Sequence, residues 1–115
     1  MGAIVAVVVI SVGCTAQPRH LDRVFIANPT VYPMHVEVST PERYRWLGLG
    51  HVMPSATAEF AEAIDQGPRW AVRFRYVDCQ DTVVVDRGQL ADRDDPVSVP
   101  VSVERCLRDA GVPAS

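Results

Sequence analysis

Two of the three histidines are the residues whose chemistry points most directly to a ligand. If residues 34–39 and 45–51 form a hairpin, His35 and His51 lie diagonally on one outward face, with Glu37 nearby. Two imidazoles and a carboxylate are suitable ligands for Zn²⁺ or Cu²⁺. Their spacing matches no recognised metal motif, and isolated histidines are common on strand surfaces. Metal binding is therefore an alternative hypothesis, not the leading one.

Three arginines form the one ordered charge feature of the chain. Arg69, Arg73 and Arg75 lie at alternate positions, so a strand would place them on one outward face. There they could meet an anionic ligand or a polymer of the cell envelope. Carboxylates of neighbouring strands could equally neutralise them, and we expect this outcome. The candidate partners are Glu59, Glu62 and Asp86.

No segment carries a recognised catalytic motif. The chain has no Gly-x-Ser-x-Gly elbow and no glycine-rich phosphate loop. The Asp94-Asp95 pair falls in a polar segment, where solvated turn residues are the expected interpretation. We therefore predict a protein that is not an enzyme and needs no cofactor.

One of the three cysteines lies apart from the other two in the sequence. Cys14 ends an apolar N-terminal run, whereas Cys79 and Cys106 lie in the polar body. An even pair in an oxidising compartment predicts a disulfide between Cys79 and Cys106. Closing a loop of this length stabilises a fold by about 3 to 4 kcal/mol in the chain-entropy model.

The N-terminal run has the features of an export signal. Residues 4–12 are apolar but too few to span a bilayer, and their number is typical of a signal-peptide core. Residues 1–16 are therefore assigned as a signal, residues 17–22 as a tether, and residues 23–115 as one domain. A basic segment before the apolar run is missing.

The end of this signal resembles that of bacterial lipoproteins. In that family a small residue precedes a cysteine that becomes lipidated at the mature N-terminus; Gly13 and Cys14 fit this pattern, while Ser11 stands where leucine is usual. The resemblance implies a membrane anchor through Cys14. Small residues at Cys14 and Ala16 also permit ordinary cleavage after Ala16, which would release a secreted protein. We favour lipidation.

Composition excludes nucleic acid as a partner. All 11 basic residues are arginine, 14 residues are acidic, and the net charge is −3. Such a balance provides no electrostatic attraction to nucleic acid or to an anionic membrane surface.

Short runs with a period of two predict strands along the body. Residues 24–26 and 34–38, separated by an Asn-Pro turn signal, are expected to form a hairpin. Residues 45–52 form the next predicted strand. Its two glycines indicate a bulge or an edge, and Trp46 is expected to anchor the core.

The segment 55–65 fits either a helix or a strand. Its periodicity and alanine content favour a helix, whereas the neighbouring strands favour a strand with Phe60 pointing inward, which we adopt. Residues 69–77 alternate without a break and predict a central strand. A strand at 82–85 and a helical turn within 87–92 follow.

The last predicted strand comprises residues 97–103, where Pro100 requires an edge position or a bend. Ser102 is expected to cap a short C-terminal helix that ends before Gly111. About seven short strands with turns between them predict an all-β fold. The expected architecture is an antiparallel immunoglobulin-like sandwich with a short C-terminal helix.

The body resembles a group of small exported actinobacterial proteins of unknown function. The shared pattern consists of Asp65-Gln66-Gly67, Trp70, Arg73-Phe74-Arg75 and the tail from Leu107 to Pro113. The resemblance implies a fold and an extracytoplasmic location, and it carries no catalytic residue. The leading hypothesis is a non-enzymatic, envelope-associated module that binds an unknown protein or envelope polymer.

Overall fold

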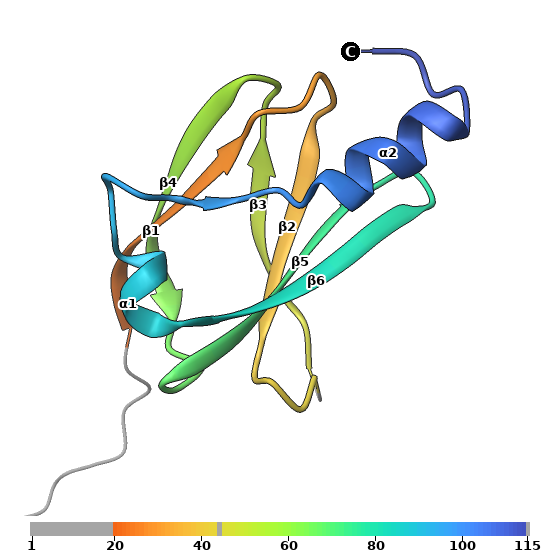
Figure 1. Ribbon diagram of the computed structural model, residues 1–115. Coiled ribbons are helices and arrows are strands. Elements are labelled where there is room, and N and C mark those ends of the chain that lie inside the picture. Colours follow the sequence, from red (N-terminus) through yellow and green to blue (C-terminus); the bar gives the residue numbers. More distant parts are fainter. Residues whose placement is uncertain (1–19, 44, 115) are drawn as a thin grey trace, which may run out of the picture.

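The computed structural model describes residues 20–43 and 45–114, with side chains from residue 23 onward (Figure 1). The predicted signal and the lipidation residue Cys14 lie outside the described residues. The first strand begins at His20, so it includes the last three residues of the predicted tether.

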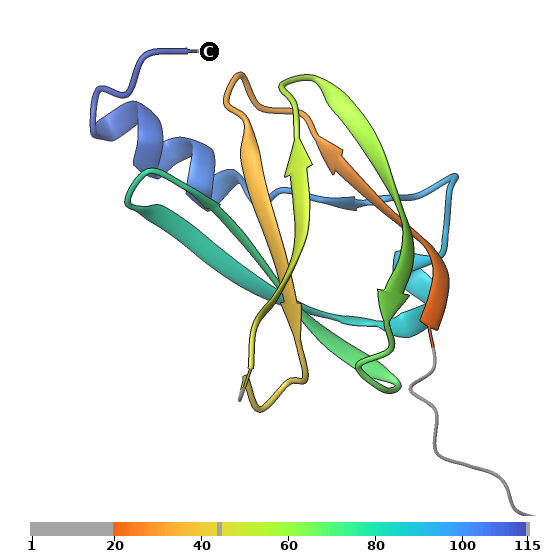
Figure 2. The same cartoon turned by 180° about the vertical axis from the view of Figure 1, so that it is seen from behind.

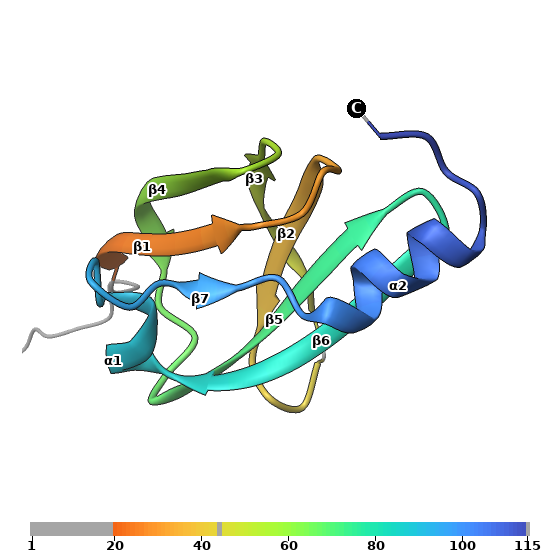
Figure 3. The ribbon, with the colours of Figure 1, turned by 45° about the horizontal axis from the view of Figure 1, so that its top comes forward.

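The described residues form two sheets and two short helices. The strands are β1 (His20–Asn28), β2 (Met34–Ser39), β3 (Leu47–Val52), β4 (Ala56–Ile64), β5 (Arg69–Tyr76), β6 (Cys79–Asp86) and β7 (Val97–Ser98). The helices are α1 (Arg87–Leu90) and α2 (Val101–Asp109). One sheet has the order β4-β1-β7 and the other β3-β2-β5-β6 (Figure 3). The predicted all-β fold with a short C-terminal helix is confirmed.

Strand β5 lies between β2 and β6, which confirms the predicted central strand. Trp70, Val72 and Phe74 alternate along it and are fully buried against the other sheet. Each buries a large apolar side chain, which stabilises the fold by about 1.5 to 3 kcal/mol per residue. The intervening arginines must therefore point away from the core.

The segment 55–65 contains strand β4, so the choice of a strand over a helix is confirmed. Phe60 is half-buried and packs against the core. Its ring lies against Gly50 of β3, where a Cβ atom would come within 3.0 Å of Phe60 Cε1. Gly50 also has a φ of 144°, so a side chain there would be strained. In Figure 2, a short loop at the top of the view connects β3 to β4.

The predicted hairpin of β1 with β2 is wrong. β1 pairs with β4 and β7, whereas β2 pairs with β3 and β5, so the chain crosses between sheets after Asn28. The buried Asn28 amide donates hydrogen bonds to the carbonyls of Tyr32 and Val52 at 2.7 and 3.0 Å. Its Oδ1 accepts one from the Thr30 hydroxyl at 2.7 Å. These bonds hold an irregular crossover in place of a tight turn.

The predicted strand over 97–103 is wrong beyond Ser98. β7 has two residues and runs parallel to β1, so the sandwich is not antiparallel throughout. β7 does lie at the edge of its sheet, but Pro100 lies beyond the end of the strand. Pro100 itself, not Ser102, is the N-cap of α2. The Ser102 hydroxyl instead donates a hydrogen bond to Asp81 of β6.

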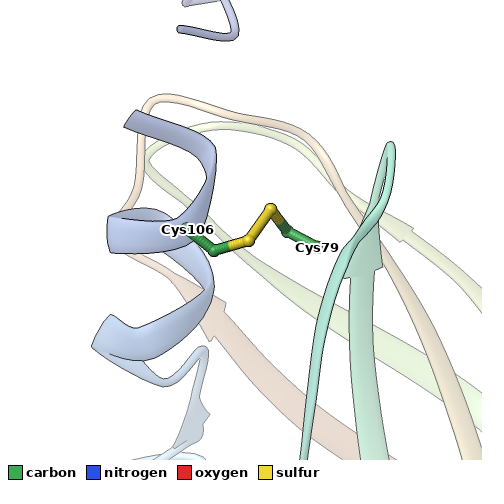
Figure 4. Close-up of a disulfide and its surroundings, with 2 residues drawn as sticks. All are labelled: Cys79 and Cys106. Carbon is green, nitrogen blue, oxygen red and sulfur yellow. A yellow bond between two sulfur atoms is a disulfide. The ribbon is translucent and has the colours of Figure 1, made fainter. Parts of the chain in front are cut away.

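A disulfide joins Cys79 to Cys106, as predicted (Figure 4). Cys79 begins β6 and Cys106 lies in α2, and their Cα atoms are 5.9 Å apart. Val103 and Leu107 of α2 are buried on the same side of the helix. The covalent bond therefore holds the helix against the tip of the β5–β6 hairpin.

Among the described residues, we find no helix with the length and apolar character needed to cross a membrane.

Replacing both half-cystines, as Cys79→Ala with Cys106→Ala, is expected to lower the free energy of unfolding by about 3 to 4 kcal/mol, because the unfolded chain gains loop entropy. Urea titration followed by tryptophan fluorescence measures the change. An unfolding curve that matches the oxidised parent would contradict the stabilising role of the bond.

Candidate binding face on the four-stranded sheet

The sheet β3-β2-β5-β6 has one face in the core and one facing away from it. We call the second the outer face and define it by His35, Glu37, His51, Arg73 and Arg75. Each of these residues follows or precedes a fully buried core residue along its strand. The alternation of a strand therefore brings all five to one side.

Cross-strand pairing places His35 at the centre of this face. His35 lies directly opposite His51 on β3 and Arg75 on β5. The predicted shared face of the two histidines is therefore found, although they are directly paired instead of diagonal. Their rings are tilted, with centroids 4.9 Å apart.

A bulge in β3 makes this arrangement possible. The pairing with β2 passes from Val36 and Gly50 to Glu37 and Gly48, so Leu49 is the extra residue. Gly48 lies beneath the His35 ring, where an added Cβ would be 3.8 Å from Cε1. The prediction that the glycines mark a bulge or an edge is confirmed, because β3 is also an edge strand.

Glu37 forms ion pairs with both neighbouring arginines. Its Oε1 lies 2.9 Å from Arg73 Nη2 and 3.4 Å from Arg75 Nε. The Glu37 side chain is only 13% exposed, so these cations compensate the loss of hydration. One carboxylate against two guanidinium groups leaves this part of the outer face with an excess of positive charge.

Each of the three arginines lies near a carboxylate, as expected, but Arg73 and Arg75 share one, so the predicted neutralisation is only partial and its partners partly differ. Asp86 lies 3.6 Å from Arg69, as expected. Glu59 instead pairs with Arg23, at 2.8 Å. Glu37 takes the role that the sequence interpretation gave to Glu59 and Glu62. The cross-strand register of β2 and β5 determines this partner, and register between distant strands has no local sequence signal.

Trp46 was expected in the core, and this prediction is wrong. Its ring lies over the Arg73 guanidinium, 4.2 Å from centroid to Cζ, in a cation–π contact. Leu47, the next residue, packs against the core, so Trp46 points to the opposite side. Trp70 is the tryptophan that anchors the core.

The histidine pair forms only part of a metal site. Glu37 Oε2 is 4.0 Å from His35 Nε2, longer than the roughly 3.3 Å between two ligands of a tetrahedral ion, and Glu37 is engaged by arginines. No cluster of three or more metal-binding side chains is found among residues 20–43 and 45–114. Binding of Zn²⁺ or Cu²⁺ through His35 and His51 stays a prediction.

Comparison with protein-family models, with curated proteins and with solved structures finds no significant match.

Burial lowers the pKa of His35. The Glu37 carboxylate acts in the opposite direction, while His51, Arg75 and Arg73 lower the pKa further. We therefore expect NMR titration to give a His35 pKa below about 6.5, the ordinary value. Glu37→Gln should lower it further, and Arg75→Gln should raise it.

The lowered pKa of His35 makes the stability of the fold depend on pH in a definite direction. The unfolded chain binds the His35 proton first, so the free energy of unfolding should fall as the pH drops from about 6.5 to the lower folded pKa. A His35 pKa at or above the ordinary value would contradict the arrangement.

Proposed function

We propose that the chain is an exported, non-enzymatic binding module of the cell envelope that acts through the outer face. The observation that carries this proposal is the grouping of two imidazoles, two guanidinium groups and an aromatic ring on one sheet surface. Arginine and tryptophan are the side chains that contribute most often to binding energy at protein interfaces. A protein or an envelope polymer is the proposed partner.

The disulfide supports an extracytoplasmic location. Such bonds persist in oxidising compartments and are rare in the cytosol. The same location follows from the export signal expected in residues 1–16. We propose that Cys14 is lipidated and anchors the domain to the membrane, with secretion after cleavage at Ala16 as the alternative.

We further propose that the sandwich is of immunoglobulin-like type. The pairing of β1 with β4, and of β2 and β6 with β5, is the order of strands B–E and C–F–G in that fold. β3 would then be strand C′, next to strand C. β7 lies beside β1 as strand A lies beside strand B, but it follows the other strands in the chain and runs parallel to β1. Loops at the ends of such sandwiches and their exposed sheet faces are common binding surfaces.

The binding role can be tested by sedimenting the purified chain with envelopes of the producing cell. We expect Trp46→Ala and Arg73→Gln to reduce binding by at least about fivefold, because each removes a partly exposed contact of the outer face. Arg108→Gln on α2 is the matched control, since it removes an exposed ion pair away from this face. Circular dichroism confirms folding of each variant. Equal sedimentation of all four proteins would contradict the proposal.

The anchor can be tested by intact mass spectrometry of the mature protein from its own cell. We expect a chain that starts at Cys14, carries acyl groups, and is two hydrogens lighter than the reduced form because of the disulfide. A chain that starts at Gln17 would show ordinary cleavage after Ala16. A chain that keeps Met1 would contradict export by either route.

A further inference from the structure

One end of the outer face is hollowed. A concave site of about 370 Å³ lies where β2 begins and where β3 and β5 end. It is lined by Pro33, His35, His51, Arg75, Tyr76 and Val77. Its size lies within the range of small-molecule sites, and its lining combines apolar walls with a few polar groups.

We propose that this hollow binds a small organic carboxylate, with Arg75 holding the carboxylate and Val77 contacting an attached apolar group. This inference rests on the proposed function of the outer face as a binding surface, and it specifies the chemistry of the ligand.

Arg75 is the cation available for such a ligand. Arg73 lies closer to Glu37 and also donates to it from Nε at 3.0 Å. Arg75 approaches the same oxygen only at 3.4 Å, and it donates no hydrogen bond to any residue in the described ranges. Its side chain is 45% exposed. A guanidinium group in this state can hold a carboxylate through two parallel hydrogen bonds.

The histidines add donors to the same site. His35 lies directly across from Arg75, and its ring faces His51 across the pair of strands. A neutral imidazole retains one N–H that can donate to an anion. An anion thus meets donors from three neighbouring strands.

The same charges disfavour a metal ion. Two guanidinium groups lie beside the imidazoles, and the nearby carboxylate of Glu37 is already paired with both. A divalent cation at His35 would be repelled by these arginines and would have to displace Glu37 from them. The excess of positive charge favours an anionic ligand over Zn²⁺ or Cu²⁺.

Val77 supplies an apolar wall of the hollow. It occupies the turn between β5 and β6 with a φ of 54°, a conformation that branched residues adopt very rarely. Its side chain is also 56% exposed. Glycine or asparagine would suit this turn better. Two-residue hairpin turns require a positive φ, and Arg43, Ser55 and Glu62 also adopt one outside the hollow; at Val77 this conformation places an apolar side chain at the wall of the hollow.

Neighbouring contacts hold this wall in position. Tyr76 pairs with Cys79, which is covalently joined to α2. The Tyr76 ring lies 6.1 Å from that of Tyr32, whose hydroxyl donates to the Val112 carbonyl at 2.9 Å. The hollow is therefore built on a braced turn, and a ligand would bind with little ordering of the chain.

Calorimetric titration of the full chain tests the proposal. The probes are hexanoate and N-acetyl-leucine, which represent lipid-derived and peptide carboxylates, and their uncharged amides. We expect one or both acids to bind at least tenfold more tightly than the matching amide. The acid that binds shows whether the ligand is a lipid-derived or a peptide carboxylate. Arg75→Gln should lose at least tenfold in affinity. Arg69→Gln, on the same strand but at its other end, should bind as the parent does.

A second variant separates ligand binding from folding. Val77→Asn should raise the midpoint of thermal unfolding, because it relieves the turn, and should weaken binding, because it removes an apolar wall. Equal affinity for acids and amides, unchanged affinity in Arg75→Gln, or binding of Zn²⁺ with no binding of either acid would overturn the proposal. If neither acid binds but envelope binding still depends on Trp46, the carboxylate proposal fails and the outer face remains a binding surface for a different class of ligand.

Discussion

The alternation of side chains along β5 is the constraint on which the rest of the structure depends. Within eight residues this strand supplies three fully buried core side chains and, alternating with them, the two guanidinium groups of the outer face. A shift of one residue against β2 would turn the arginines into the core, at a prohibitive cost in hydration. Burial of Trp70 and Phe74 thus determines where Arg73 and Arg75 must lie.

Glu37 then distinguishes the two arginines from each other. Arg73 is fixed by Glu37 on one side and by the Trp46 ring on the other. Arg75 makes only the longer contact to Glu37 and borders the hollow. The same strand therefore provides one arginine that is part of a packed surface and one that is accessible to a ligand. Their difference arises from neighbours on β2 and before β3, not from β5 itself.

Local pattern was sufficient for the features that depend on a single segment. The strand β5 and the C-terminal helix follow from spacing within each segment, whereas the strand β4 follows from the predicted strands that flank it in the chain. The disulfide followed from cysteine number and expected compartment. These predictions need no knowledge of which strands are neighbours.

Features that depend on which distant segments lie side by side were missed or only partly predicted. The Asn-Pro pattern predicts a hairpin at Asn28, whereas the structure has a crossover. The hydrogen bond from Asn28 to Val52 helps to hold this crossover, and Val52 is far along the chain. The parallel pairing of β7 and the partnership of Glu37 with both arginines likewise require the register of distant strands.

The strain at Val77 has no sequence signal at all, because an alternating strand that continues into valine looks regular. The covalent bond two residues later joins the start of β6 to α2, so this end of the β5–β6 hairpin is anchored on the helix. The disulfide therefore does more than stabilise a small domain. It also fixes the end of the hairpin whose turn places Val77 at the rim of the hollow.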